Sequence, residues 1–71
     1  MKLGDLIKQR RETAGMSLQD VADAVGATKG YIWEIENGKT ANIGLLLATR
    51  LSIALAVPVN ALAASALESQ T

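Results

Sequence analysis

The side chains that could do chemistry in this chain of 71 residues are seven basic and seven acidic ones, because histidine and cysteine are absent. Their absence excludes disulfides, thiol catalysis and the common zinc sites. The sequence also contains neither a glycine-rich phosphate loop nor a cluster of carboxylates, so it offers no catalytic constellation. We therefore expect no enzyme, no metal and no cofactor. The lysines and arginines can still bind anionic groups such as phosphates.

The spacing of small and apolar residues from Leu18 to Asn37 predicts two short helices joined by a tight turn. Ala22 provides the small side chain needed where two helices cross closely, and Gly26 tolerates the positive φ of the turn. Ile32 and Ile35 share one face of the second helix and would attach it to the core. This pattern is a helix-turn-helix, and it indicates DNA binding.

The charge balance is unusual for such a domain. The formal net charge is zero, whereas DNA-binding domains generally carry an excess of lysine and arginine. Between Ala41 and Leu67 the only charged side chain is Arg50. Local placement decides the field at a contact surface, so the neutral total predicts modest non-specific affinity rather than none.

Five helices and no strands are predicted along the chain. Ser17 caps the second helix with Asp20 as its capping-box partner, and Thr28 caps the third. Asn42 is the expected cap of the fourth helix, and Pro58 fits the first turn of the fifth. The expected ranges are Leu3–Ala14, 18–26, 29–36, Ile43–Ala56 and Pro58–Leu67.

These helices are expected to form one domain, residues 1–68, with the helix-turn-helix at 18–37 and a frayed tail at 69–71. No charged-then-apolar signal segment is present at the N-terminus. The apolar run from Ile43 to Val57 is interrupted by polar residues and is too short to span a bilayer. We therefore expect a soluble, cytoplasmic protein.

From Leu3 to about Leu62 the sequence resembles the lambda-repressor-like helix-turn-helix family, the XRE type that includes phage repressors and Cro proteins. The resemblance implies a compact, all-α, five-helix domain whose third helix enters the major groove while the second crosses the DNA backbone. The matching residues are Arg11, Gly15, Ser17-Leu18, Val21-Ala22, Gly26, the string Tyr31 to Lys39, and Leu55 to Val59.

Carried over position by position, the resemblance implies two sets of DNA contacts. The family's base-facing positions are occupied here by Thr28, Lys29, Gly30 and Glu34. The positions that usually touch phosphate are occupied by Tyr31, Asn37, Lys39 and Thr40. Arg10 on the first helix is also free to reach a phosphate.

Two residues depart from the family pattern. Leu18 stands where the family often has glutamine, so one phosphate hydrogen bond is lost. Gly30 replaces a longer side chain, which weakens base readout at that position. Lys29 can donate to guanine or act only as a solvated or phosphate-binding lysine. Glu34 either accepts from cytosine or serves as a gatekeeper that repels DNA or pairs with Lys29.

Arg11 and Glu36 occupy positions that often pair across the first and third helices of the family, so we interpret them as a structural ion pair. Trp33 lies next to Ile32 and cannot point the same way. We expect its indole to pack against residues 39–41, with a contact to the DNA backbone at the rim as the alternative.

The predicted fourth helix is apolar on nearly all sides, which is typical of a helix that needs a partner. Its face formed by Leu45, Ala48, Ser52 and Leu55 is expected to lie in the core. The remaining apolar residues would form a two-fold homodimer interface, unless the fifth helix covers them within one chain. The interface residues expected are Leu46, Ile53, Val59 and Leu62.

The sequence thus predicts a dimeric transcription regulator of prokaryotic or phage type that binds a pseudo-palindromic operator in double-stranded DNA. A phage Cro-like regulator, a restriction-modification controller and an antitoxin with a toxin as protein partner all remain open. So does the question whether the chain is complete or part of a longer protein. The alternative function is a protein-interaction module of the same fold, acting through its last two helices with little DNA binding.

Overall fold

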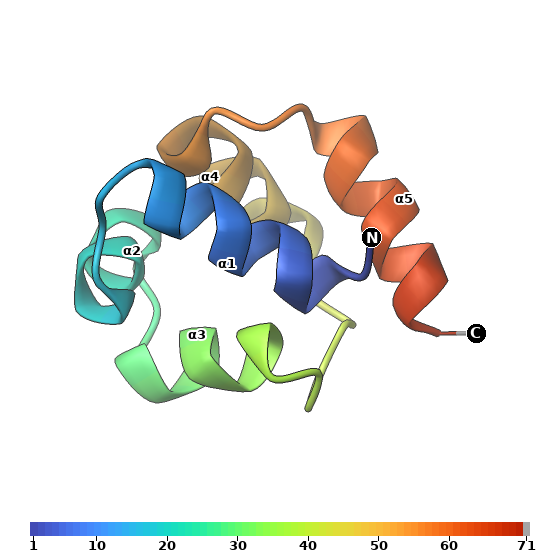
Figure 1. Cartoon of the computed structure of the whole chain (residues 1–71), viewed down its shortest axis with the longest axis horizontal. Helices are drawn as coiled ribbons and strands as arrows, with labels where there is room; N and C mark the ends of the chain where they lie inside the picture. Colours follow the sequence, from blue (N-terminus) through green and yellow to red (C-terminus); the bar gives the residue numbers. More distant parts are fainter. Residues whose placement is uncertain (71) are drawn as a thin grey trace.

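The computed structural model describes residues 1–70, and this part of the chain is all-α (Figure 1). Loops of a few residues join its helices, and no strand occurs in the described range. The helices are α1 (Leu3–Thr13), α2 (Leu18–Val25), α3 (Lys29–Glu36), α4 (Leu45–Leu55) and α5 (Val59–Ser69). None of them combines the length and the apolar character needed to cross a bilayer.

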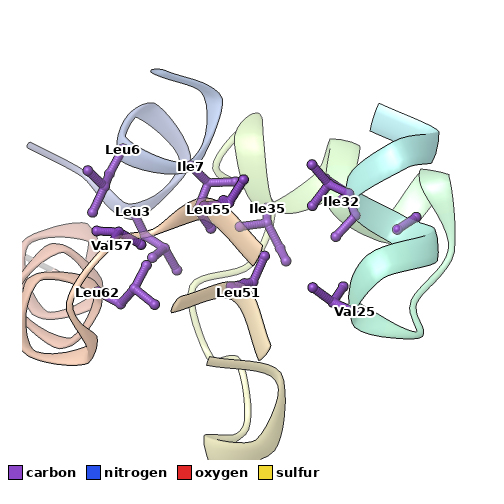
Figure 2. Packing of buried hydrophobic residues seen from close by; sticks show 12 residues of the cluster. Leu3, Leu6, Ile7, Val25, Ile32, Ile35, Leu51, Leu55, Val57 and Leu62 are labelled. Carbon is purple, nitrogen blue, oxygen red and sulfur yellow. The ribbon is translucent and has the colours of Figure 1, made fainter. Parts of the chain in front are cut away.

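Helix α1 is the centre of the arrangement, because it contacts α3, α4 and α5 (Figure 1). Helix α2 packs on α3 and α4, so the two halves of the helix-turn-helix are held against different neighbours. Figure 2 shows the apolar side chains that meet between these helices. The fully enclosed side chains of largest volume are Leu3, Ile7, Val21, Val25, Ile32, Ile35, Leu51 and Leu62.

The residues expected to build the helix-turn-helix take their predicted roles. Ala22, Ile32 and Ile35 are buried, and Gly26 ends α2 in the left-handed region with φ 72°. Ser17 and Asp20 form the predicted capping box, with the Asp20 N–H donating to Ser17 Oγ at 3.0 Å and the Ser17 N–H donating to Asp20 Oδ2 at 2.9 Å. This confirms the start and the end of the first helix of the motif.

The capping box makes the stability of α2 depend on pH. The hydrogen bonds from the backbone and the hydroxyl of Ser17 lower the pKa of Asp20 below its ordinary value of 3.8. A carboxylate whose pKa is depressed by folding stabilises the fold above its unfolded-state pKa, and that contribution is lost as the pH falls through the folded-state pKa.

We expect Asp20→Ala to lower the urea midpoint of unfolding at pH 7, because the Ser17 N–H loses its acceptor. The difference from the wild-type chain should shrink as the pH falls below 3.8. Asp23→Ala is the matched control, since it removes a carboxylate from the same helix outside the cap. A difference between wild type and Asp20→Ala that persists unchanged at low pH would contradict the capping role of the carboxylate.

Helix α4 differs from its prediction in both start and orientation. It begins at Leu45 with Gly44 as the N-cap residue, and no side chain, including that of Asn42, caps it. Ile43 instead remains in the loop and packs against the core. The buried residues of α4 are Leu51 and Leu55. Leu45 is 78% exposed, so the expected core face at this residue was wrong.

The joint between α4 and α5 is built by backbone geometry. Ala56 caps α4 in the left-handed region with φ 53°, and Val57 then turns into the core. Pro58 is the N-cap residue of α5 rather than a member of its first turn, and the helix continues to Ser69, past the predicted end at Leu67. This helix contributes Leu62 to the core.

The two ends of the described chain are tied together. The Leu3 N–H at the start of α1 donates to Ser69 Oγ at 2.9 Å, and the Ser69 hydroxyl donates to the Ser65 carbonyl at 2.9 Å. The Met1 amino group also bonds Glu68 Oε2 at 2.7 Å. Ser69 is therefore the last residue of α5, and the fraying expected from this residue onward stays a prediction. Thr71, also assigned to the frayed tail, lies outside the described residues.

Helix α1 approaches the end of α3 closely at Gly4, a residue that the sequence analysis did not single out. A Cβ atom at this position would lie 2.5 Å from the Ile35 carbonyl oxygen and 2.6 Å from that of Glu36. Only glycine permits this approach of a helix to the backbone of its neighbour. The contact fixes the position of α3 relative to the central helix.

Candidate nucleic-acid interface

The turn between α2 and α3 is held by hydrogen bonds on both sides. The Ala27 N–H donates to the Ala22 carbonyl at 2.9 Å, and Thr28 Oγ1 accepts from the Tyr31 N–H at 3.1 Å to cap α3. Arg50 reaches across from α4 and donates to the Val25 carbonyl at 3.4 Å. A guanidinium at a helix C-terminus also complements the helix dipole. These contacts set the angle at which α3 leaves the turn.

Helix α3 divides into a buried and an exposed side. Ile32 and Ile35 face the core and have no solvent-accessible surface. The four residues expected to face DNA bases are all exposed and gather around the first turns of α3; they are Thr28, Lys29, Gly30 and Glu34. Their backbone positions are thus fixed by the core, while their side chains remain available to a partner.

The residues expected to touch phosphate are more scattered. Lys39 is exposed in the loop after α3, and Thr40 beside it is half-buried. Tyr31 is half-buried and packs against the core. Asn37 uses its side-chain amide to donate to the Trp33 carbonyl at 2.9 Å. Arg10 is exposed on α1, outside the helix-turn-helix.

An ion pair links α1 to the end of α3. Arg11 Nε donates to Glu36 Oε2 at 2.7 Å and Arg11 Nη2 donates to Glu36 Oε1 at 3.1 Å, in a bidentate geometry. Arg11 Nη1 also donates to the Met16 carbonyl at 2.9 Å. The hydrogen bond with Glu36 raises the pKa of Arg11 above its ordinary value, although burial opposes the shift. Both side chains are thereby used within the fold.

The start of α2 carries few groups that can meet phosphate. Leu18 is half-buried and packs against the core, so no side-chain donor is present at this position. Asp20 is occupied in the capping box, and Asp23 accepts a hydrogen bond from Gln19 at 2.8 Å. The exposed cations nearest in sequence to the turn and to the end of α3 are Lys29 and Lys39.

Trp33 stands out on α3 because it is a large apolar side chain with about half of its surface exposed. The residue is 48% exposed and is not one of the buried residues of the hydrophobic core. Its expected packing on residues 39–41 stays a prediction. The sequence indicates that Trp33 faces away from the core, because adjacent residues of a helix are about 100° apart and Ile32 beside it is buried.

The surface of α4 and α5 exposes apolar side chains at Leu46, Ile53 and Val59, three of the residues expected in a dimer interface. An apolar groove of about 290 Å³ lies between the two helices. Leu62, the fourth expected residue, is only 1% exposed and belongs to the core. It also lines this groove, so its contact with a second chain stays a prediction.

Comparisons with known proteins agree with this geometry. Residues 2–64 match the family model of a helix-turn-helix domain. The structure is similar to that of SinR, which is described as the master regulator for biofilm formation and was solved in complex with DNA. The two proteins share 33% sequence identity, and the match covers 86% of this chain and 97% of that chain with a TM-score of 0.79. The N-terminal DNA-binding domain of SinR from Bacillus subtilis matches at the same identity, share of this chain and TM-score, over 88% of its own length. No curated protein matches the chain. The chain belongs to the lambda-repressor-like helix-turn-helix family.

Proposed function

We propose that this protein binds double-stranded DNA sequence-specifically and regulates transcription as a homodimer in the cytoplasm of a prokaryotic or phage-infected cell. The observation that carries the proposal is the exposed side of α3, which includes Lys29 and Glu34. The buried isoleucines on the opposite side of the helix fix its position on the domain. The SinR structure with DNA supports it, since that relative has the same fold at 33% identity.

In this proposal α3 enters the major groove and α2 crosses the backbone. Lys29 donates to guanine O6 or N7, and Glu34 accepts from the amino group of cytosine. Thr28 supplies a short hydroxyl at the start of the helix, and Gly30 contributes no side chain. The phosphate contacts are assigned to Tyr31, Asn37, Lys39, Thr40 and Arg10, which fix the register of the helix but carry no sequence information.

Binding to a random DNA duplex over a range of salt concentrations tests this function. We expect measurable binding at low salt that weakens as salt rises, with a modest slope because few lysines and arginines are free to meet phosphate. Lys39→Ala should weaken binding to all sequences alike, whereas Lys29→Ala should relax the preference at one operator position. Undetectable binding of any duplex at low salt would contradict the DNA-binding function.

Two features support the proposed homodimer, the size of the domain and its apolar surface. The longest extent of the described chain is 29 Å, so two copies side by side can place their α3 helices one DNA turn, about 34 Å, apart. The exposed Leu46 and Ile53 of α4 lie seven residues, or two helical turns, apart and share one side of the helix. Exposed apolar residues of this kind mark interaction surfaces.

We expect Ile53→Glu to yield a monomer, because a carboxylate would be desolvated at the centre of the proposed contact. Ile53 is 78% exposed in the single chain, so the substitution should leave the fold intact. Sedimentation equilibrium measures the mass, and Leu46→Glu should act in the same way. Gln9→Glu adds the same charge to the exposed side of α1 and serves as the control. An unchanged mass for both variants of α4 would reject this interface.

A second candidate function is a protein-interaction module that uses the same α4–α5 surface. The zero net charge and the apolar groove favour it. The salt titration separates the two candidates, because an interaction module would not bind the DNA duplex even at low salt. Ile53→Glu should prevent such a module from binding its protein partner. Within the DNA-binding function, the protein serves as a Cro-like regulator, a restriction-modification controller or an antitoxin, and selection of bound sites from a random library would reveal its operator.

A further inference from the structure

The outward face of α3 contains two residues, Gly30 and Trp33, that the assigned contacts do not explain. At about 100° per residue, Gly30 lies roughly 170° from the midpoint of the buried pair Ile32 and Ile35, directly opposite the core. Trp33 and Glu34 lie about 130° from that midpoint on its two sides. The part of α3 farthest from the core is therefore an indole and a carboxylate with a glycine between them.

The position of Gly30 is an open gap in this face. A Cβ atom placed there meets nothing within 4 Å, so neither flanking side chain covers the glycine. The residue is helical and shows no positive φ that would require glycine, and an alanine would favour the helix by about 1 kcal/mol. The absence of a side chain thus has no explanation in the fold and leaves the helix backbone accessible from outside.

Trp33 borders this gap with an exposed ring. About half of its surface is open to solvent, and it is not one of the buried residues of the hydrophobic core. Lys29, one helical turn before it, is the exposed cation on the same side of the helix. A large, rigid aromatic side chain in such a place is typical of residues that contact a partner.

We infer that Trp33 is a specificity-determining residue that places its indole against the C5-methyl group of a thymine in the major groove, with the gap at Gly30 admitting the methyl group close to the helix. This inference rests on the proposed DNA-binding function and deepens it. The thymine methyl is the apolar group that the base pairs present in the major groove, so it is the natural partner of an exposed indole there. Trp33 then selects an A·T pair beside the pairs read by Lys29 and Glu34.

Thymine-to-deoxyuridine exchange tests the inference, because it removes the methyl group and leaves every hydrogen-bonding group in place. On a duplex that the wild-type protein binds, each thymine is replaced singly and the dissociation constant is measured. We expect one replacement per half-site to weaken binding about four-fold, the value of one buried methyl group. Trp33→Ala should abolish the difference between thymine and deoxyuridine at that position.

Two further variants, the fluorescence of Trp33 and a stability measurement serve as controls. Lys29→Ala should retain the discrimination against deoxyuridine, and Trp33→Phe should retain part of it, because phenylalanine keeps an apolar ring. Trp33 is the only tryptophan in the chain, so its fluorescence should change on binding the thymine duplex and less on binding the deoxyuridine duplex. The urea midpoint of Trp33→Ala should fall by less than truncation of a core residue would cause, since about half of the indole side chain is exposed.

The outcomes separate the inference from the function beneath it. If the wild type and Trp33→Ala both bind DNA and show the same change in dissociation constant at every deoxyuridine position, that result would overturn the thymine contact and leave the proposed DNA-binding function standing. A uniform loss of affinity in Trp33→Ala on all duplexes would assign the indole to the DNA backbone instead and would likewise overturn it. Failure of the wild-type protein to bind any duplex at low salt would overturn both.

Discussion

Replacement of Gly4 by alanine is expected to lower the free energy of unfolding by about 2–3 kcal/mol, the upper part of the range for forcing an extra methyl group into a packed site. The new Cβ atom would lie 2.5 Å from the Ile35 carbonyl oxygen and 2.6 Å from that of Glu36. Both atoms belong to the backbone, so no side-chain rotation can relieve the clash. Helix α1 must move away from α3 and loosen the core contacts around Ile7 and Ile35.

Gly30→Ala is the matched control for this prediction, because it makes the same substitution at the second residue of another helix of the same fold. With open space around its Cβ position, it should raise the free energy of unfolding by about 1 kcal/mol through helix propensity alone. Urea unfolding followed by circular dichroism measures both variants. A Gly4→Ala protein as stable as the wild type would mean that the close approach of α1 to α3 does not exist.

Removal of the guanidinium in Arg11→Met is expected to lower the free energy of unfolding by about 3 kcal/mol, the lower end of the loss when one partner of a buried ion pair is deleted, because the Arg11 side chain is 14% exposed. The Glu36 side chain is only 4% exposed, and its carboxylate would lose the two hydrogen bonds that it accepts from Arg11. The Met16 carbonyl would lose its Arg11 donor as well. The loop after α1 and the end of α3 should therefore both loosen.

Arg10→Met provides the control, because Arg10 is the adjacent arginine and is exposed. It should change the unfolding free energy by less than about 1 kcal/mol, as surface charges generally do. A double variant, Arg11→Met with Glu36→Met, should recover part of the loss, since no unpaired charge then remains buried. Equal effects of Arg10→Met and Arg11→Met on the urea midpoint would contradict the structural role of the pair.

The features that were predicted from the sequence are local ones. Ser17 and Asp20 are three residues apart, and the hydrogen bonds of a capping box depend only on that spacing and on the start of a helix. Gly26 ends α2 because a positive φ at the turn is a property of the residue itself. The spacing of Ile32 and Ile35 placed the buried side of α3 for the same reason.

The features that were missed depend on tertiary contacts. Ile43 and Leu45 are both apolar and close in sequence, and only the packing of the loop decides that the first turns inward and the second outward. Gly4 and Gly30 are both glycines inside helices, and the structure alone reveals that one is enclosed and the other open. Leu62 could not be separated from the exposed apolar residues of α4 and α5 because nearly every face of these helices is apolar.

The candidate site was predicted in part. Its backbone positions follow from the motif, and the exposure of Lys29 and Glu34 agrees with the roles given to them. The outward position of Trp33 was harder to assign, because an aromatic residue next to a buried one can also fold back over a loop. The base that each side chain contacts depends on the sequence of the DNA site and on how the protein docks there. The sequence of the protein specifies neither of these.

The hydrogen bond from the Leu3 N–H to Ser69 Oγ makes the first turn of α1 depend on a residue 66 positions away. Segments linked in this way open as a cooperative unit in hydrogen exchange. The amide proton of Leu3 should therefore exchange at the rate at which α5 detaches, and Ser69→Ala should accelerate its exchange without changing that of Ile32. We expect the amide of Leu3 to become protected during folding only after the C-terminal helix has docked, although it lies at the start of the sequence.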